Sequence, residues 1–329
     1  MKALQYVEQD TPAVSELPIP DIAEDEVLVA ARAVGVCHSD IELLEGRYII
    51  PFQYPLIPGH EWSGEVVKVG AKVKGLIVGD RVVGECVIGD DHFGFSISGA
   101  AAEFFTAKES WLHKLPDAVD YTNGALVEPF SVAYYALMRV GNVNASDVLV
   151  VLGAGPIGLA VTAGAKALGA ITVVVEPVAH RQEAAKKLGA DHVVGPDGLD
   201  ALLKDITGGK GANVVIEATG NPAVMAQALE IAAFKGRVGY IGIDVGREAP
   251  AKLGLIQSKE LTITGSIGSP GVWPDTLRFM ANKGIDLSPL VTSTFEVDNA
   301  VGAVDAAQDP AHNIKAHIPH QVWQWAEQA

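Results

Sequence analysis

The sequence reads Gly153-Ala154-Gly155-Pro156-Ile157-Gly158 directly after the apolar run 147–152, and a helix-like segment follows. A second apolar run, 171–175, ends at Glu176. A strand, glycine turn, helix, second strand and acidic residue in this order are typical of a dinucleotide-binding unit. The glycines allow a tight turn, close approach of a pyrophosphate to the backbone, and close packing of the helix on the sheet. The segment therefore predicts a dinucleotide whose phosphates lie at the N-terminus of the helix.

Glu176 predicts the choice of cofactor. A carboxylate at the end of the second strand can accept hydrogen bonds from both ribose hydroxyls and would repel a 2'-phosphate, so we expect NAD rather than NADP. Arg181 either covers the adenine or pairs with a phosphate, or it is an exposed helix arginine. Three later segments, each after a strand, either border the nicotinamide or only end their strands in turns. The predicted cofactor-binding residues are Gly153, Gly155, Pro156, Ile157, Gly158, Glu176, Arg181, Thr219, Gly242, Ile243, Ser266 and Ile267.

From residue 148 onward, short β-branched runs alternate with helical patterns, which predicts a doubly wound α/β sheet of six parallel strands. The predicted strands are 148–152, 171–175, 192–194, 213–217, 237–241 and 261–264. The predicted crossover helices are 157–168, 179–188, 200–206 and 222–234. We therefore expect a Rossmann NAD-binding domain over residues 130–267.

The residues before this domain form strand-like runs at 26–34, 64–69 and 80–83, with Gly and Pro between them and little helix. They predict a β-rich domain. The tail after it reads as helices at 273–282 and 297–307 and a strand at 313–318, and it is too short for a core of its own. We expect a second, catalytic domain made of residues 1–129 and 268–329.

Composition narrows the class of protein. The 329 residues are 49% hydrophobic and 19% charged, which indicates a well-packed globular chain of more than one domain. A net charge of −16 argues against nucleic acid and against an anionic membrane as partners. The N-terminus lacks the apolar core of a signal peptide, and two cysteines make no disulfide framework. A cytoplasmic enzyme fits these features.

A candidate metal site comes from three separated segments. Cys37 lies in Gly35-Val36-Cys37-His38-Ser39-Asp40, His60 and Glu61 follow Gly59, and Glu128 lies in Leu126-Val127-Glu128-Pro129. A thiolate, an imidazole and carboxylates can enclose zinc and leave one position open for a substrate oxygen. Taken singly, each residue also has an ordinary structural explanation, such as a buried thiol, a loop histidine or a capping carboxylate.

These motifs occur in an order that resembles one family. Over nearly its whole length the chain is similar to the zinc-dependent medium-chain alcohol dehydrogenases, most closely their sorbitol or iditol (polyol) dehydrogenase branch. The resemblance implies a catalytic domain of GroES-like β-barrel type, a secondary alcohol or ketone as small-molecule substrate, and a homo-oligomer, either dimer or tetramer. It also implies that zinc lowers the pKa of the substrate hydroxyl before hydride passes to the nicotinamide.

The resemblance assigns roles by position. Cys37, His60 and Glu61 occupy metal-ligand positions, and Glu128 lies where relatives have a further ligand or a nearby acid. Because a thiolate and two carboxylates would place three negative charges around one divalent ion, we expect only one of Glu61 and Glu128 to bind strongly at a time. Asp40 is expected to accept a hydrogen bond from His60 and so fix its tautomer. Ser39 matches the hydroxyl that takes the substrate proton.

The chain departs from the family in two places. Many relatives carry a histidine three residues after the relay hydroxyl, where this chain has Glu42: either Glu42 passes the proton, a water route replaces it, or it is merely exposed. Relatives often hold a structural zinc with four close cysteines, and the matching stretch 84–94 has only Cys86. We therefore expect one catalytic zinc ion per chain and no structural zinc.

Two other functions remain open from the sequence. One is a zinc-free quinone or enoyl reductase of the same superfamily, and the other is a non-enzymatic nucleotide-binding protein. The sequence does not identify the alcohol, the physiological direction or the oligomeric state.

Overall fold

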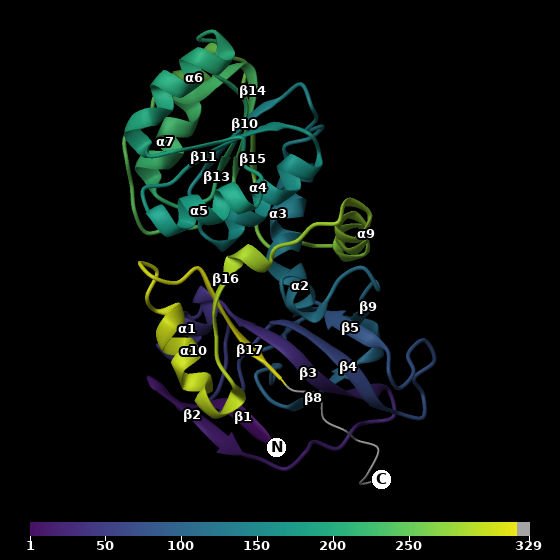
Figure 1. The fold of residues 1–329 in the computed structure, drawn as a ribbon. Helices are drawn as coiled ribbons and strands as arrows, with labels where there is room; N and C mark the ends of the chain where they lie inside the picture. The colour runs from purple at the N-terminus through teal and green to yellow at the C-terminus, as the bar shows by residue number, and fades with distance from the viewer. Residues whose placement is uncertain (321–329) are drawn as a thin grey trace. The chain divides into compact units, whose positions relative to one another are not determined.

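The structure is a computed structural model that describes residues 1–320 of the chain. The chain divides into two compact units (Figure 1). Unit 1 comprises Met1–Glu128, Leu277–Gly284 and Val291–Ala329, and unit 2 comprises Pro129–Thr276 and Ile285–Leu290. The last nine positions of the predicted catalytic domain, 321–329, lie outside the described residues.

Unit 2 contains a six-stranded sheet in the order β12-β11-β10-β13-β14-β15, and every neighbouring pair is parallel. The prediction of a doubly wound, six-stranded parallel sheet is therefore confirmed. Its strands are β10 (Val148–Leu152), β11 (Ile171–Val175), β12 (His192–Val194), β13 (Ala212–Glu217), β14 (Ala232–Tyr240) and β15 (Thr262–Gly265). Its helices are α3 (Val127–Arg139, which begins in unit 1), α4 (Pro156–Ala167), α5 (Ala179–Lys187), α6 (Leu199–Thr207), α7 (Pro222–Ile231), α8 (Gly254–Ser258) and α9 (Trp273–Lys283, which ends in unit 1).

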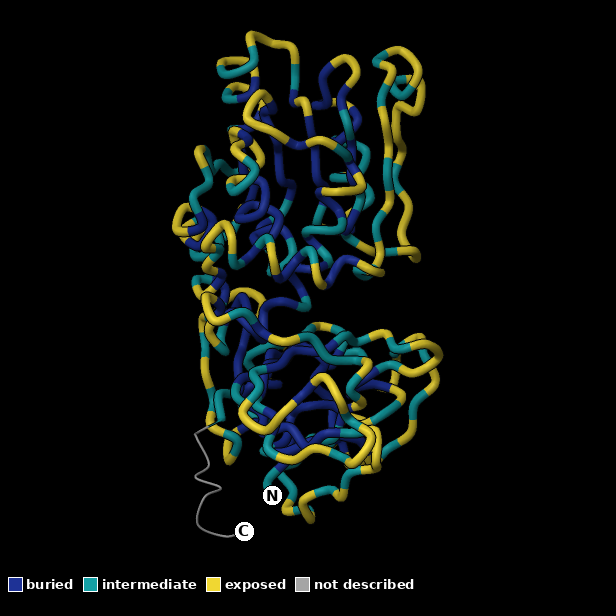
Figure 2. The backbone as a smooth tube through the Cα atoms, turned by 90° about the vertical axis from the view of Figure 1, so that its right-hand side faces the viewer, coloured by how far each residue is buried: buried dark blue, intermediate teal, exposed yellow. Residues whose placement is uncertain are grey.

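The central strands of this sheet are apolar because both of their faces are covered. All five residues of β10 are buried, and the strands appear as dark blue segments in Figure 2. Helices cover a parallel sheet on both sides, so its strands read as continuous hydrophobic runs. The order of strands reverses between β10 and β13, which are neighbours in the sheet. In folds of this kind ligands bind beyond the carboxyl ends of the strands at such a reversal.

The predicted helix 222–234 is too long at its C-terminal end. Helix α7 ends at Ile231, and β14 begins at Ala232, which pairs with β13. The ammonium group of Lys259 donates hydrogen bonds to the carbonyl oxygens of Leu229, Glu230 and Ala232. These contacts satisfy carbonyl groups that a longer helix would have used internally, so the helix ends there. The pattern of apolar residues alone does not reveal a cap supplied by a distant lysine.

Unit 1 is built on a seven-stranded sheet in the order β16-β17-β3-β4-β5-β9, with β8 paired to β3. The 11-residue strand β3 lies at its centre and is almost wholly buried. The sheet strands are β3 (Glu26–Val36), β4 (Glu61–Val69), β5 (Arg81–Gly84), β8 (Phe104–Lys108), β9 (Leu112–Lys114), β16 (Val291–Thr294) and β17 (Lys315–Pro319). The hairpins are β1 (Lys2–Glu8) with β2 (Thr11–Glu16) and β6 (Val87–Ile88) with β7 (Asp91–His92); the helices are α1 (His38–Leu44), α2 (Tyr121–Ala125) and α10 (Ala300–Ala307).

The C-terminal tail supplies two strands of this sheet. Strand β17 pairs antiparallel with β3, with Ala316 opposite Val36 and His317 opposite Gly35. The predicted helix 297–307 is a 3-10 turn at Val297–Asn299 followed by α10. This pairing brings the start of β17 against the C-terminal end of β3, where Cys37 follows. Within residues 1–320, no helix has the length and apolar character needed to cross a membrane.

Candidate functional site

Cys37 lies at the junction between β3 and α1. Strand β3 ends at Val36, and Cys37 is the N-cap residue of α1. The backbone N–H of Cys37 donates a hydrogen bond to Oδ2 of Asp40, 2.8 Å away, in the first turn of the helix. An acidic side chain in this position is favourable because the N-terminus of a helix carries partial positive charge. Asp40 therefore fixes the backbone that carries the thiol.

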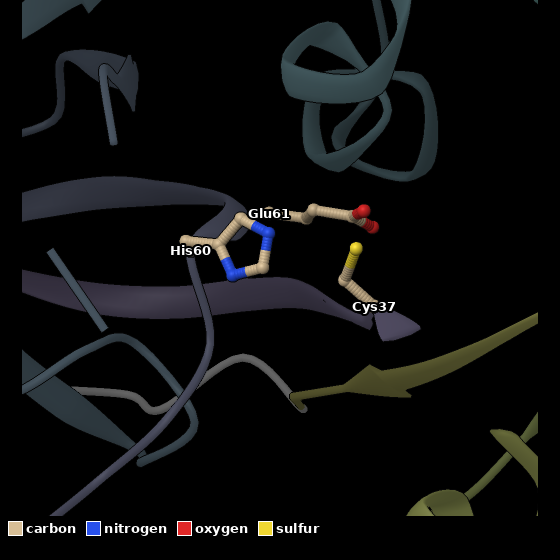
Figure 3. A group of neighbouring side chains, drawn as sticks. All are labelled: Cys37, His60 and Glu61. Atoms are coloured by element: carbon tan, nitrogen blue, oxygen red, sulfur yellow. The ribbon is translucent and has the colours of Figure 1, made fainter. Parts of the chain in front are cut away.

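His60 and Glu61 come from the start of the neighbouring strand, β4. Gly35 of β3 pairs with Glu61, so the register places the beginning of β4 beside the end of β3. Gly59 precedes them with a φ of 98°, a conformation that glycine adopts without strain. One ligand atom each from Cys37, His60 and Glu61 lies within 4.8 Å of the other two (Figure 3). Three residues from two separated motifs thus converge on one point.

The donor set of this group fits zinc. It offers one sulfur, one imidazole nitrogen and one carboxylate oxygen, the three ligand types that zinc accepts in proteins. His60 and Glu61 are buried, with 4% and 1% of their surfaces exposed, and Oε2 of Glu61 is buried with no hydrogen-bond partner within residues 1–320. A buried carboxylate oxygen in this state favours a cation as its missing partner. Three ligands also leave a fourth position for substrate, as in catalytic zinc sites.

Asp40 also faces His60. Its Oδ1 lies 3.3 Å from Nδ1 of His60, an ion-pair distance without the alignment of a hydrogen bond. Burial by itself would lower the pKa of His60, but the nearby charges of Asp40 and Cys37 raise it well above its ordinary value. Because Nδ1 faces Asp40, Nε2 is the nitrogen left for a metal ion. The expected orienting contact is present in position, whereas the aligned hydrogen bond is not.

Lys315 completes the site and was not predicted. Its ammonium nitrogen lies 2.7 Å from Oε1 of Glu61 and 3.3 Å from the carbonyl oxygen of Val36. The lysine side chain is only 3% exposed. Burial would lower its pKa, but the charges of Glu61 and Cys37 raise it. The sequence does hold a signal, because a lysine inside the strand-like run 313–318 is unusual for a buried strand.

Glu128 lies near this group but outside it. It is the second residue of α3 and is partly buried, and it is not among the ligand atoms that lie within 4.8 Å of one another. Burial raises its pKa to about 7; the positive charge of His60 opposes this rise and the negative charge of Glu61 adds to it. In this arrangement Glu61, rather than Glu128, is the carboxylate that joins the thiol and imidazole.

The remaining polar residues of the first motif lie on α1. Ser39 is partly buried in its first turn. Glu42 lies 4.0 Å from His38 and 4.0 Å from Arg47 in ion-pair contacts near the surface. The Glu42 side chain is 36% exposed at this point.

Aromatic side chains pack against the imidazole. The ring centroid of Phe95 lies 4.7 Å from that of His60 and 4.2 Å from that of Tyr48, with which it is stacked. Phe93 packs on Trp62 and Phe105 in the core. Phe95 lies one residue beyond, and Phe93 lies within, the stretch 84–94 that the resemblance matches to the four-cysteine lobe of relatives. The single thiol of this stretch, Cys86, is partly buried, and burial raises the pKa of that thiol to about 12.

The glycine-rich turn of unit 2 has the geometry of a phosphate-binding turn. Gly153 has a φ of 97°, and α4 begins at Pro156 with Gly155 as its N-cap. A Cβ on Gly158 would lie 2.0 Å from the carbonyl oxygen of Gly153, so only glycine fits there. A Cβ on Gly155 would meet nothing within 4 Å, so the space beside it is open to a ligand. Pro156 and Ile157 form the first turn of the helix, whose N–H groups face that space.

Glu176 connects this turn to the end of β11. Its Oε2 accepts a hydrogen bond from the backbone N–H of Ala154 at 2.7 Å, and its Oε1 accepts one from Val178 at 3.0 Å. The residue is 3% exposed. Each carboxylate oxygen can accept a second hydrogen bond, which leaves capacity for ribose hydroxyls. The carboxylate thus has a structural role in the turn that its sequence position does not reveal.

The later predicted cofactor residues lie at the same, carboxyl edge of the sheet. Thr219 follows β13, and its methyl carbon would be 2.6 Å from a Cβ on Gly153. A Cβ on Gly242 would lie 2.1 Å from the backbone nitrogen of Gly220, so the loops after β13 and β14 approach closely. Three further residues occupy this edge, and a fourth lies in α5. Ile243 is 63% exposed, Ile267 is 71% exposed, Ser266 donates its N–H to the carbonyl oxygen of Tyr240, and Arg181 is partly buried in α5.

Comparison with known proteins places both halves of the chain. Residues 23–117 match the family model of the alcohol dehydrogenase GroES-like domain, and residues 156–282 match that of zinc-binding dehydrogenases. The chain is 33% identical to a sorbitol dehydrogenase of Bacillus subtilis, over 89% of this chain and 90% of that protein. It is 34% identical to the (R,R)-butanediol dehydrogenase of Bacillus subtilis, over 92% and 94% of the two chains. The crystal structure of 2R,3R-butanediol dehydrogenase from Bacillus subtilis superposes with a TM-score of 0.88 at 31% identity, over 97% of this chain and 99% of that one.

Proposed function

Because this chain belongs to the zinc-type medium-chain alcohol dehydrogenase superfamily, near its polyol dehydrogenases, and is therefore an oxidoreductase, we propose that it oxidises a secondary alcohol with NAD. The reaction converts the alcohol and NAD⁺ to a ketone, NADH and a proton, and it is reversible. The substrate class is a polyol, a sugar alcohol or a related small alcohol. The observation that carries this proposal is the convergence of Cys37, His60 and Glu61 on one point.

The proposed roles in unit 1 follow from the contacts of each side chain. Cys37, His60 and Glu61 hold one zinc ion, which when bound acts as a Lewis acid that lowers the pKa of a hydroxyl group. Asp40 holds the Cys37 backbone and faces Nδ1 of His60. Ser39 accepts the hydroxyl proton of the substrate and passes its own hydroxyl proton on to solvent. Glu128 stands beside the group as the alternative carboxylate.

In unit 2 the proposed cofactor is NAD. The open space beside Gly155 receives the pyrophosphate at the N-terminus of α4, and Glu176 receives the ribose hydroxyls. A buried carboxylate at this point disfavours a 2'-phosphate, which supports NAD over NADP. Thr219, Gly242, Ile243, Ser266 and Ile267 are proposed to border the nicotinamide. We propose residues 130–267 as the nucleotide domain and residues 1–129 with 268–329 as the catalytic domain; the compact units differ from these bounds mainly at 268–276 and 285–290, which belong to unit 2.

One zinc ion per chain is part of the proposal. A four-thiolate structural site needs more cysteines than the two in this sequence. The cysteines are both unpaired thiols, which supports a reducing compartment such as the cytoplasm. A dimer or tetramer is proposed from the resemblance.

The test is a panel of polyols and secondary alcohols, with NAD and with NADP, followed by the absorbance of the reduced cofactor. We expect formation of NADH with at least one secondary alcohol, loss of the rate after chelation, and its return when zinc is added. Full activity in protein whose measured metal content is near zero would favour a zinc-free reductase. Binding of zinc and NAD without turnover of any alcohol or ketone would favour a non-enzymatic protein.

A further inference from the structure

Lys315 places a buried positive charge against a proposed metal ligand. Its side chain is 3% exposed, that of Glu61 is 1% exposed, and the atoms joining them are 2.7 Å apart. Lysine is almost never fully buried unless it is paired, because removing an ammonium group from water is costly. The carbonyl oxygen of Val36, at 3.3 Å, is the second acceptor for this ammonium group. The lysine is therefore held at this position by the ends of β3 and β4.

The Glu61 carboxylate is divided between two neighbours. Oε1 accepts the hydrogen bond from Lys315, while Oε2 has no hydrogen-bond partner in the described part of the chain. Oε2 packs against Gly35, where a Cβ would lie 2.4 Å from it. Gly35 thus leaves room for the carboxylate at the end of β3. Lys315 fixes one oxygen and leaves the other available to a cation.

Besides fixing the Glu61 carboxylate, the charge of Lys315 affects how strongly the site binds a metal ion. Without metal, Lys315 is the hydrogen-bonded cation that compensates the buried Glu61. A zinc ion held by Glu61 would lie close to the ammonium group, and like charges repel strongly where water is excluded. Such a coupling is reciprocal: a lysine that is destabilised by zinc must weaken the binding of zinc to the same extent.

We propose that Lys315 is a positioning residue and an internal counter-cation for Glu61, which keeps the carboxylate in place without metal and lowers the affinity of the site for zinc. This inference rests on the proposed function, because it takes zinc as the metal of the Cys37, His60 and Glu61 group. Loss of the lysine charge would leave Glu61 as an uncompensated buried carboxylate. That carboxylate would destabilise the metal-free protein and bind zinc more tightly.

The experiment compares the wild type with Lys315→Met. Zinc dissociation constants are measured by competition with a chromophoric chelator, and melting temperatures are measured with and without zinc. We expect the dissociation constant to fall by about tenfold or more, within the usual range of coupling between sites, and the melting temperature to fall mainly in the metal-free protein. If Lys315→Met folds only with zinc, the same constant is measured by adding the chelator to the loaded protein.

Two further variants make the result specific. Arg32→Met removes a cation that lies 2.6 Å from Glu65 on the same pair of strands, away from the metal group, and should leave the dissociation constant unchanged. In a Glu61→Gln background, Lys315→Met should keep only the part of its effect that comes from direct repulsion between the ammonium group and zinc, because the carboxylate that Lys315 compensates is gone. An unchanged or weaker zinc affinity in Lys315→Met would overturn the role of the lysine. Absence of zinc binding in the wild type would instead overturn the proposed function.

Discussion

The group around Cys37 and the turn at Gly153 use different parts of the chain to form a binding site. Around Cys37, the ends of two strands and a returning tail bring together side chains that carry the chemistry, and most of them are ionisable and buried. At Gly153, the backbone forms the site, and the essential property of two glycines is the absence of a side chain. We therefore expect the group around Cys37 to be sensitive to the identity of the terminal atom of each side chain. We expect the turn at Gly153 to be sensitive to the addition of any side-chain carbon atom.

The largest effect is expected when the sulfur of the metal group is removed. Cys37→Ala leaves only two of the three ligands, so zinc content should fall and turnover should fall by more than about a hundredfold. Metal analysis and initial rates measure the two quantities on the same preparation. Cys86→Ala is the matched control and should keep both. Normal zinc content and a normal turnover rate in Cys37→Ala would show that the sulfur of Cys37 is not needed at this site.

The next effect separates two glycines of the turn. In Gly158→Ala the added Cβ would lie 2.0 Å from the carbonyl oxygen of Gly153, so the free energy of unfolding should fall by about 1–3 kcal/mol. In Gly155→Ala the Cβ meets nothing within 4 Å, so the fold should be kept. The methyl group would nevertheless occupy the approach to the backbone, and NAD binding should weaken by about tenfold or more.

Urea unfolding and titration with NAD distinguish the two variants. If Gly155→Ala bound NAD as the wild type does, the pyrophosphate would not approach this part of the backbone. If Gly158→Ala were as stable as the wild type, close packing would not explain this glycine.

A smaller effect is expected at Glu176. This residue has an ionisable, buried side chain, as in the group around Cys37, but it belongs to the glycine-rich turn. Glu176→Gln removes the negative charge and keeps one carbonyl oxygen as an acceptor. NAD should bind about tenfold more weakly, since hydrogen bonds to a charged group contribute about 1.5–3 kcal/mol. NADP should lose less, because the repulsion of its 2'-phosphate is removed. The dissociation constants of both cofactors are measured by fluorescence, and an unchanged ratio between them would contradict the assigned role.

The last prediction concerns the pH dependence of stability in unit 1. Burial, with the charge of Lys315 as a second cause, lowers the pKa of His317 to about 3. Between about pH 6.5 and 3 the unfolded chain binds a proton that the folded protein excludes, so this histidine makes the folded protein less stable as the pH falls. Its contribution is about 1.4 kcal/mol per pH unit in that range.

His317→Gln should remove this part of the slope. The free energy of unfolding in urea, measured for both proteins at several pH values between about 6.5 and 4.5, gives the difference directly. Equal slopes would mean that His317 is not held neutral by its buried position. The same measurement on Gly155→Ala should reproduce the wild-type slope, because that substitution changes no charge.

The sequence predicts the sheet of unit 2 well because its signal is local. Each buried strand is a continuous apolar run, and β11 and β12 have the predicted bounds. The predicted boundary between α7 and β14 is wrong because the observed boundary depends on Lys259, which caps the helix from a distant segment. Local periodicity is therefore sufficient to predict that a helix or strand exists. It is insufficient to predict the end of a helix that a side chain from a distant segment caps.

The candidate site shows the same division. The donor types of Cys37, His60 and Glu61 are visible in the sequence, but their proximity depends on the register that places Gly35 opposite Glu61. Lys315 was missed because it is 254 positions from Glu61, and only the pairing of β17 with β3 brings it there. Long-range strand pairing is the part of the fold that a single sequence specifies least directly.

The two cysteines differ in a way that allows metal binding to be followed by the reactivity of a thiol of the chain itself. Burial raises the pKa of Cys86 to about 12, so this thiol stays protonated and reacts slowly with alkylating reagents. Cys37 and Cys86 are both partly exposed, but only the sulfur of Cys37 is an atom that the proposed metal ion would cover. The rate of alkylation by iodoacetamide therefore measures whether a metal ion covers the sulfur of Cys37. This measurement needs neither substrate nor cofactor.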